Sequence, residues 1–215
     1  MILYIDVYII GLEVIEITII RFILERVLDA MRINNDLILP DTHPSLRDKC
    51  VDIKLPINKE DKELLLSMLE YVHDSHDDTL KEKYNLRAAV GLAAPQVGVN
   101  KKMIAICISY EDDEDLTLAL VNPKIISHSQ QHAYLASGES CLSVVEDVEG
   151  YVPRFARITV KGYDMIQEKE ITLRLSGYEA IVVQHEIDHL SGILYYDHIN
   201  KNNPFANIAN AIVIE

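Results

Sequence analysis

Apolar positions recur at helical spacing between residues 58 and 75. The spacing is i, i+3, i+4, i+7, which is typical of an amphipathic helix with one buried face. The apolar set is Leu65, Met68, Leu69 and Val72. Asn58 stands just before this stretch, and asparagine is a favoured N-cap residue. The pattern therefore predicts a helix over 58–75, and we expect a second, shorter helix over 78–86.

Beyond residue 100 the pattern changes to β-branched runs separated by polar or glycine-containing turns, which predicts strands. The runs cover 101–109, 116–127, 157–164 and 169–176. A late helix follows the last run and includes "QHEIDHLSGILYY" (184–196). Helices first, strands in the middle and one late helix indicate an α+β fold, with mixed or antiparallel β-sheets around a central helix.

The first thirty residues are rich in Ile, Leu and Val, but charged residues interrupt them every few positions. A membrane-spanning helix needs about 20 mostly apolar residues, so we expect no span here. Neither the basic start of a signal peptide nor the basic excess of a transit peptide is present. Three alternatives stay open: an extra packed element, an interfacial amphipathic segment, or sequence upstream of an initiator at Met31. We therefore separate an N-terminal apolar extension (1–30) from a single domain (31–215).

The formal net charge of −14 argues against a nucleic-acid substrate, because so negative a surface repels phosphate backbones. The three cysteines, Cys50, Cys107 and Cys141, are too few and too scattered for a disulfide framework. Together with the missing secretion signal, they indicate reduced thiols and a cytoplasmic location.

The late helix carries two histidines four residues apart. Successive helical residues turn by about 100°, so His185 and His189 stand about 40° apart on one face, with Glu186 about 100° to the side. The arrangement is typical of a hydrolase in which two imidazoles hold a metal ion and the glutamate accepts a proton from water. We expect Gly192 to keep this face uncrowded and Leu194 to pack on the opposite face. The alternative is a core helix with hydrogen-bonded histidines.

A catalytic metal usually has three protein ligands, so a third must be found. Downstream, the metzincin pattern would place a histidine where this chain has Tyr195, and His198 is off that spacing. Upstream, Cys141 lies in "SGESCLSV" among small and polar residues, whereas Cys107 lies in an apolar run. A thiolate is a strong ligand for a soft or borderline divalent ion. Cys141 is therefore a candidate ligand, with an ordinary cysteine as the alternative.

A third stretch, "VGLAAPQVG" (90–98), is rich in small residues. Gly91 and its alanine neighbours let another segment or a ligand approach closely, and Pro95 stiffens the chain. The amide of Gln96 could hydrogen-bond a carbonyl. The alternative is a tight loop with close packing.

"VGLAAPQ", "ESCLS" and "QHEIDH", in this order, closely resemble the three motifs of the peptide deformylases. The similarity extends to "HPSLR" (43–47), "LVNPKIISHS" (120–129) and the stretch 177–199, and it covers roughly residues 31–215. The long insertions between helix and sheet segments resemble the type 2 branch of Gram-positive bacteria. The resemblance implies a peptide deformylase-like fold around a metal-binding helix. It also implies removal of the formyl group from the N-terminal formyl-methionine of newly made polypeptides.

The resemblance assigns roles by position. It implies three metal ligands: Cys141, His185 and His189. It makes Glu186 the general base and then the acid, while Gln96 and the backbone N–H of Leu142 stabilise the oxyanion. The positions near the substrate are Val90, Gly91, Glu139 and Val182. Val182 lies one turn before Glu186 on the same side of the helix, so it can line the methionine pocket.

The family usually carries one Fe²⁺ per chain, with Ni²⁺, Co²⁺ or Zn²⁺ as substitutes. The implied partners are N-formylmethionyl nascent polypeptides and, transiently, the ribosome, although no strongly basic terminal helix supports docking there. Two positions depart from the family motifs, since Ala89 and Ser140 stand where glycine is usual. Ser140 could narrow the cleft, hydrogen-bond the substrate backbone or require a different local φ. Neither change removes a ligand, base or oxyanion donor, so we expect activity to survive.

Two other functions are weighed against this one. A general metallopeptidase should cleave unformylated peptides, and it should tolerate Cys141→Ala if its third ligand lies elsewhere. A non-catalytic relative that binds N-termini would usually have lost the base or a ligand, and this sequence retains both.

Overall fold

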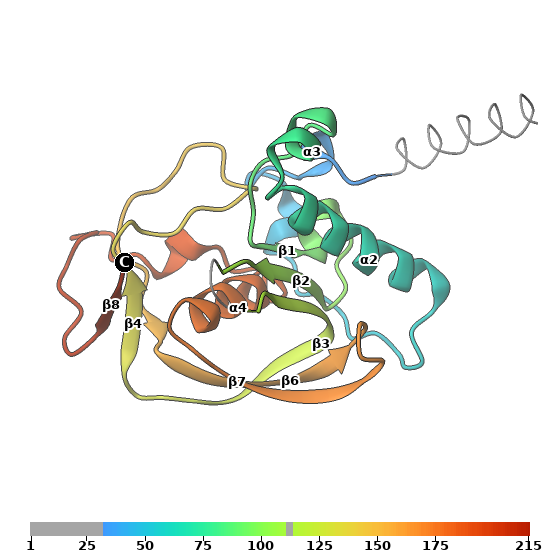
Figure 1. Cartoon of the computed structure of the whole chain (residues 1–215). Coiled ribbons are helices and arrows are strands. Elements are labelled where there is room, and N and C mark those ends of the chain that lie inside the picture. Colours follow the sequence, from blue (N-terminus) through green and yellow to red (C-terminus); the bar gives the residue numbers. More distant parts are fainter. Residues whose placement is uncertain (1–31, 111–113) are drawn as a thin grey trace, which may run out of the picture. The chain divides into compact units, whose positions relative to one another are not determined.

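The computed structural model describes residues 32–110 and 114–215, so the expectations for residues 1–30 lie outside the described chain. The helices are α2 (Lys59–Asp74), α3 (Asp78–Lys83) and α4 (Gly177–His189), with 3-10 turns η1 (Asn35–Leu37), η2 (Pro44–Arg47), η3 (Ala94–Val97) and η4 (Tyr195–His198) (Figure 1). The strands are β1 (Gly91–Ala93), β2 (Met103–Ile108), β3 (Leu116–His128), β4 (His132–Leu135), β5 (Arg154–Phe155), β6 (Arg157–Asp164), β7 (Lys169–Ser176) and β8 (Ile212–Ile214). None of the helices in the two described ranges combines the length and the hydropathy that a membrane-spanning segment requires.

Helix α2 forms where its apolar spacing predicts it. Asn58 is its N-cap, and the side-chain oxygen accepts a hydrogen bond from the N–H of Asp61 at 2.9 Å. The buried face of α2 packs against β1, β2 and β3. Helix α3 ends at Lys83, earlier than predicted. Asn85 follows with φ of 53°, a left-handed conformation that does not continue a right-handed helix.

The larger sheet has five antiparallel strands in the order β1-β2-β3-β6-β7. Strand β2 is buried on both faces, because Met103 and Ala105 pack in the cluster beneath α2 while Ile104 and Ile106 pack in the cluster beneath α4. An unbroken apolar run is expected of a strand with two covered faces. In β6, by contrast, buried residues alternate with more exposed ones, as in a strand with one covered face.

A smaller sheet of three short strands has the order β5-β4-β8, with β8 parallel to β4. No strand was predicted in these three segments. Helix α4 contacts strands of both sheets and is flanked by them in Figure 1. Its Ile181 packs with Ala133 of the small sheet and its Val183 with the core of the large sheet. The predicted α+β fold, with mixed and antiparallel sheets around a central helix, is confirmed.

The end of α4 differs from the prediction. The helix stops at His189, so Leu194 lies beyond it and is buried outside the helical face to which it was assigned. Gly192 closes the helix with φ of 74°, and the N–H of Ile193 donates to the carbonyl of Asp188 at 3.1 Å, a hydrogen bond that commonly ends helices. A Cβ on Gly192 would lie 2.4 Å from the carbonyl oxygen of Arg47. Gly192 therefore serves this turn and its contact with η2, and the expectation that it clears space beside the histidines is wrong.

Candidate metal centre

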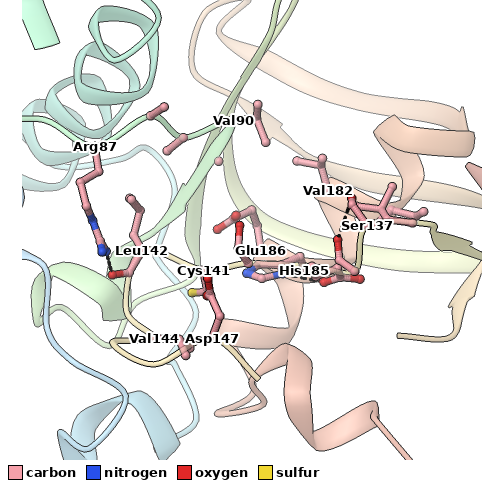
Figure 2. A pocket seen from close by; sticks show the side chains of 18 of the residues that line it. Arg87, Val90, Ser137, Cys141, Leu142, Val144, Asp147, Val182, His185 and Glu186 are labelled. Atoms are coloured by element: carbon pink, nitrogen blue, oxygen red, sulfur yellow. Dashed lines mark hydrogen bonds and ion pairs between the residues drawn. The ribbon is translucent and has the colours of Figure 1, made fainter. Parts of the chain in front are cut away.

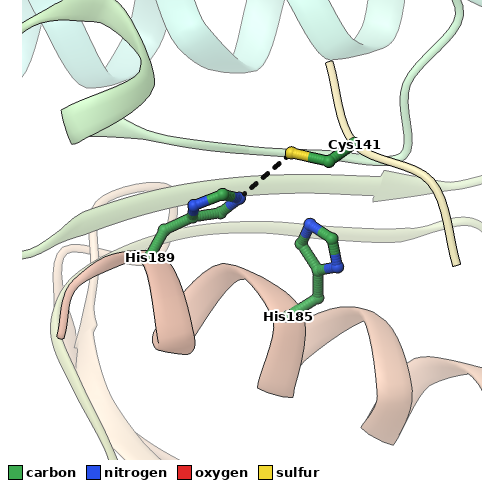
Figure 3. A group of neighbouring side chains, drawn as sticks. All are labelled: Cys141, His185 and His189. Atoms are coloured by element: carbon green, nitrogen blue, oxygen red, sulfur yellow. Dashed lines mark hydrogen bonds between the residues drawn. The ribbon is translucent and has the colours of Figure 1, made fainter. Parts of the chain in front are cut away.

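Three side chains that the sequence singled out separately meet at one place. His185 and His189 project from the same face of α4, and Cys141 approaches them from the loop between β4 and β5 (Figure 3). A ligand atom from each of the three lies within 4.8 Å of the other two. Cys141 Sγ is 3.4 Å from His189 Nε2. The tertiary structure thus brings the upstream cysteine to the helical pair.

His185 is held by a buried carboxylate. Its Nδ1 lies 2.8 Å from Glu139 Oε2, and the Glu139 side chain is only 4% exposed. Burial raises the pKa of Glu139, but Arg154 and His185 outweigh burial and hold that pKa at about 2. A charged carboxylate on one ring nitrogen favours a proton there and leaves the other nitrogen free to bind a metal ion. Glu139 was expected near the substrate. It lines the adjoining cavity, but its carboxylate is hydrogen-bonded to His185.

Arg154, in β5, completes this support and was missed in the sequence. Its Nε and Nη2 donate to the two oxygens of Glu139 at 2.8 and 2.9 Å. Nη1 also pairs with Asp188, which in turn contacts His198 Nε2 at 2.7 Å. Arg154 lies in the largely apolar stretch "YVPRFARI", and a buried arginine needs such carboxylate partners. The only sequence signal was a charge among apolar neighbours.

Glu186 lies beside the cluster and is 5% exposed. Burial raises its pKa to about 7. Its Oε2 is buried and has no hydrogen-bond partner among the described residues. Gly91 makes room for this side chain, because a Cβ there would lie 2.4 Å from Glu186 Oε1. The small residue predicted to permit a close approach therefore admits the candidate base itself.

The donor atoms suit a divalent metal ion. Burial, together with His185, lowers the pKa of His189 well below its usual value, so its ring is neutral. Burial alone would lower the pKa of His185 as well, but contacts with Cys141 and Glu139 raise it overall. A thiolate and two imidazoles are ligands preferred by borderline and soft ions such as Zn²⁺ and Fe²⁺.

Gln96 and Leu142 lie next to Cys141. Gln96 is 2% exposed, and its Oε1 accepts from the N–H of Ala93 at 2.8 Å. Its Nε2 is 3.3 Å from Ser143 Oγ and 3.5 Å from Cys141 Sγ, so the amide donor faces the cysteine loop. The N–H of Leu142 has no acceptor within the described chain. The two groups assigned to oxyanion stabilisation are thus both donors beside the metal cluster.

A cavity of about 610 Å³ opens beside these groups (Figure 2). It is lined by Cys141, His185 and Glu186 and by the four residues expected near the substrate: Val90, Gly91, Glu139 and Val182. The cavity therefore gives a ligand access to two of the candidate metal-binding residues and to the candidate base.

The polypeptide deformylase family model matches residues 36–205. The chain belongs to the peptide deformylase family. Its relatives include the peptide deformylase of Oceanobacillus iheyensis, 51% identical over 78% of this chain and 91% of that protein. Peptide deformylase 2 of Bacillus subtilis is 50% identical over 83% of this chain and 96% of that protein.

Solved structures agree with this assignment. The peptide deformylase from Thermus thermophilus has a TM-score of 0.61 at 29% identity and covers 79% of this chain and 87% of that one. A probable peptide deformylase from a synechococcus phage has a TM-score of 0.62 at 34% identity, covering 75% of this chain and 98% of that one. The protein is therefore a metal-dependent hydrolase that removes the N-terminal formyl group from nascent polypeptides. Neither a general metallopeptidase nor a non-catalytic binder is favoured.

The two departures from the deformylase motifs have different surroundings. Ser140 is exposed and lines the cavity. Its φ is not positive, since the described non-glycine residues with positive φ are Asn85, Asn122, Glu168 and Asn210. The serine therefore requires no left-handed backbone. Ala89 is partly buried, and its N–H donates to Ser75 Oγ at 3.1 Å.

Proposed function

We propose that Cys141, His185 and His189 hold one divalent ion, Fe²⁺ in the native enzyme, with Ni²⁺, Co²⁺ or Zn²⁺ as substitutes. The clustering of a thiol and two imidazoles supports a single ion. When bound, such an ion supplies a Lewis acid that polarises a carbonyl and acidifies water. Glu139 acts as the positioning group for His185 through their 2.8 Å contact.

Glu186 moves the proton in this proposal. Its unpartnered Oε2 and a pKa of about 7 are the observation on which the assignment rests. A carboxylate with a pKa near the working pH both accepts and returns protons efficiently. Glu186 therefore takes a proton from the attacking water and returns it to the departing amine. The C–N bond of the formamide breaks, and formate and a free methionyl N-terminus leave.

The oxyanion is stabilised by two donors, Gln96 Nε2 and the N–H of Leu142. Both lie beside Cys141, and the Leu142 N–H has no competing acceptor among the described residues. Preorganised donors of this kind favour the transition state, where the formyl oxygen gains negative charge. Val90, Gly91 and Val182 line the same cavity. In this proposal they surround the methionine end of the substrate.

The setting that fits this chemistry is the cytoplasm, where formylmethionyl chains emerge from ribosomes. The enzyme meets the ribosome only transiently and binds no nucleic acid directly, since its net charge of −14 disfavours contact with phosphate backbones.

Formate release from formyl-Met-Ala-Ser tests the function. The protein is purified anaerobically and loaded with Fe²⁺ or, in parallel, with Ni²⁺. We expect rapid release by the wild type and at least a roughly 100-fold lower rate for Glu186→Ala, because the general base is lost. Metal content of the natively purified protein identifies the ion. Wild-type release no faster than that of the Glu186→Ala control, or cleavage of unformylated Met-Ala-Ser, would contradict the proposal.

A further inference from the structure

Arg87 lines the cavity, and its side chain contacts the loop that carries Cys141. Its guanidinium donates to the carbonyl oxygen of Leu142 (Figure 2). Among the described residues that line the cavity, Arg87 is the only lysine or arginine. The residue is exposed, so its side chain adds little to the hydrophobic core.

Leu142 therefore carries both groups: its carbonyl oxygen accepts from Arg87, and its N–H has no acceptor among the described residues. The neighbouring carbonyls have other donors: Val144 N–H to Cys141 at 3.1 Å and Asp41 N–H to Ser143 at 2.7 Å. The peptide group before Leu142 is thus fixed by Val144 and the one after it by Arg87. The Leu142 N–H lies in the first of these planes, together with the Cys141 carbonyl, and Arg87 restrains it by holding the adjoining plane, which limits rotation of the chain at Leu142. Without Arg87, the second plane loses its side-chain restraint.

Arg87 is itself anchored to the core. Its N–H donates to the hydroxyl of Tyr71 at 3.1 Å, and that hydroxyl lies 3.4 Å from the Arg87 carbonyl oxygen. Tyr71 is 1% exposed and packs within α2. A rigid base for the Arg87 backbone restricts where its long side chain can reach. The contact between Arg87 and the Leu142 carbonyl is therefore supported by a buried residue of α2.

We propose that Arg87 is a positioning residue that aims the Leu142 N–H at the formyl oxygen. The inference rests on the proposed function, in which that N–H is an oxyanion donor. Arg87 makes no contact with the reacting atoms in this scheme and acts through the Leu142 carbonyl. Its loss should weaken an interaction made in the transition state more than binding of the substrate.

Arg87→Met keeps an apolar side chain of similar length and removes the hydrogen-bond donors, so it tests the contact with the Leu142 carbonyl alone. We expect kcat for formyl-Met-Ala-Ser to fall about 10-fold with KM changed less than about twofold, because a misaimed donor costs rate rather than affinity. Arg87→Lys should recover most of kcat, since an ammonium group can also donate to a carbonyl oxygen. Arg174→Ala, which removes an exposed arginine on β7, is the matched control and should behave as wild type.

A second readout does not depend on activity. In the Zn²⁺-loaded and the metal-free protein, the ¹⁵N–¹H resonance of Leu142 should shift and broaden in Arg87→Met and return towards the wild-type position in Arg87→Lys. The thermal midpoint should change little. An unchanged kcat, a rise in KM alone or an unmoved Leu142 resonance would overturn the inference. Wild-type protein that releases no formate would instead overturn the proposed function.

Discussion

Glu139 connects His185, a proposed metal ligand, to the guanidinium of Arg154. The Glu139 and Arg154 side chains are almost fully buried, at 4% and 3% exposure. Removing one member of a buried ion pair is costly because the other charge is left without a partner. The carboxylate also orients a metal-binding ring, so one residue affects both stability and metal affinity. Its chemistry therefore extends beyond the substrate contact that its position in the motif implied.

Glu139→Gln should lower both the stability of the fold and its affinity for metal, and each is measured by itself. We expect a loss of about 3 kcal/mol in the free energy of unfolding because Arg154 loses its charged partner. Metal affinity should fall between about 10- and 100-fold because His185 is less firmly held. Urea unfolding and competition with a chelator measure the two quantities. Lys62→Ala breaks the exposed pair with Glu168 and should cost no more than about 0.5 kcal/mol. Equal losses for the two variants would contradict the expectation.

The three cysteines should differ in reactivity. Burial raises the pKa of Cys50 to about 11 and raises the pKa of Cys107 as well, so both remain protonated thiols at pH 8. Cys141 lines the cavity and is partly buried. In the folded, metal-free protein at pH 8, we therefore expect a disulfide reagent to modify Cys141 quickly and the other two cysteines slowly.

Metal loading should protect that thiol, and denaturant should expose all three. Mass spectrometry of the modified peptides identifies the residue. Fast modification of Cys50 in the folded protein would disagree with its burial, and a Cys141→Ser variant supplies the control with no fast thiol.

At the level of single elements, α4 carries both imidazoles and the candidate base within its last five residues. The position at which the helix ends therefore affects how these three side chains are placed. The stop is made by Gly192, whose positive φ turns the chain and whose missing side chain permits contact with η2. The end of the helix is thereby joined to a turn far away in the sequence.

Gly192→Ala should destabilise the protein by at least about 2 kcal/mol, because a left-handed backbone and a clash with the Arg47 carbonyl add together. Gly98→Ala is a matched control. Gly98 also has a positive φ, but its nearest neighbour, Leu39 Cδ1, would lie 3.6 Å from the new Cβ. That variant should cost about 1 kcal/mol. Chemical denaturation gives both values, and a Gly98 variant at least as unstable as the Gly192 variant would show that the clash is relieved cheaply.

At the scale of the whole molecule, the site is assembled from three segments that lie apart in the sequence. Strand β1 and turn η3 supply Gly91 and Gln96, the loop after β4 supplies Cys141, and α4 supplies the two histidines. A bound ion would tie the loop to the helix. Because an ion that binds only the folded protein stabilises it by mass action, metal should contribute to the stability of the whole fold.

Chelation of the metal should therefore lower the thermal midpoint. At a metal concentration about 100 times the dissociation constant, bound metal adds about 3 kcal/mol to the free energy of unfolding. For a chain of this size, that corresponds to a shift of about 5–10 °C in the thermal midpoint. Thermal unfolding followed with and without chelator measures the change. His189→Ala should show little response to the chelator, since it lacks a ligand. An equal response from that variant would indicate a second metal site.

Much of the architecture followed from local patterns. The strands predicted over 157–164 and 169–176 match β6 and β7, and the Asn58 cap begins α2 as expected. Helical and strand periodicities report burial of one face, and these elements bury one face. The short strands β4, β5 and β8 went unseen because two to four residues carry too little periodicity to separate a strand from a loop.

The chemistry of this protein can be read from the chain alone: a helix with two histidines and a glutamate, a cysteine among small and polar residues, and three motifs of one enzyme family in order. Side-chain identity and helical spacing are local properties, so the chain alone carries them. The motifs implied that Cys141 joins the histidines, and the folded chain shows the three side chains together. That Arg154 and Glu139 support His185, and that Gly91 makes room for Glu186, could be seen only in the folded chain. Those contacts join distant segments, and they exist because the core packs β1, the cysteine loop and α4 against one another.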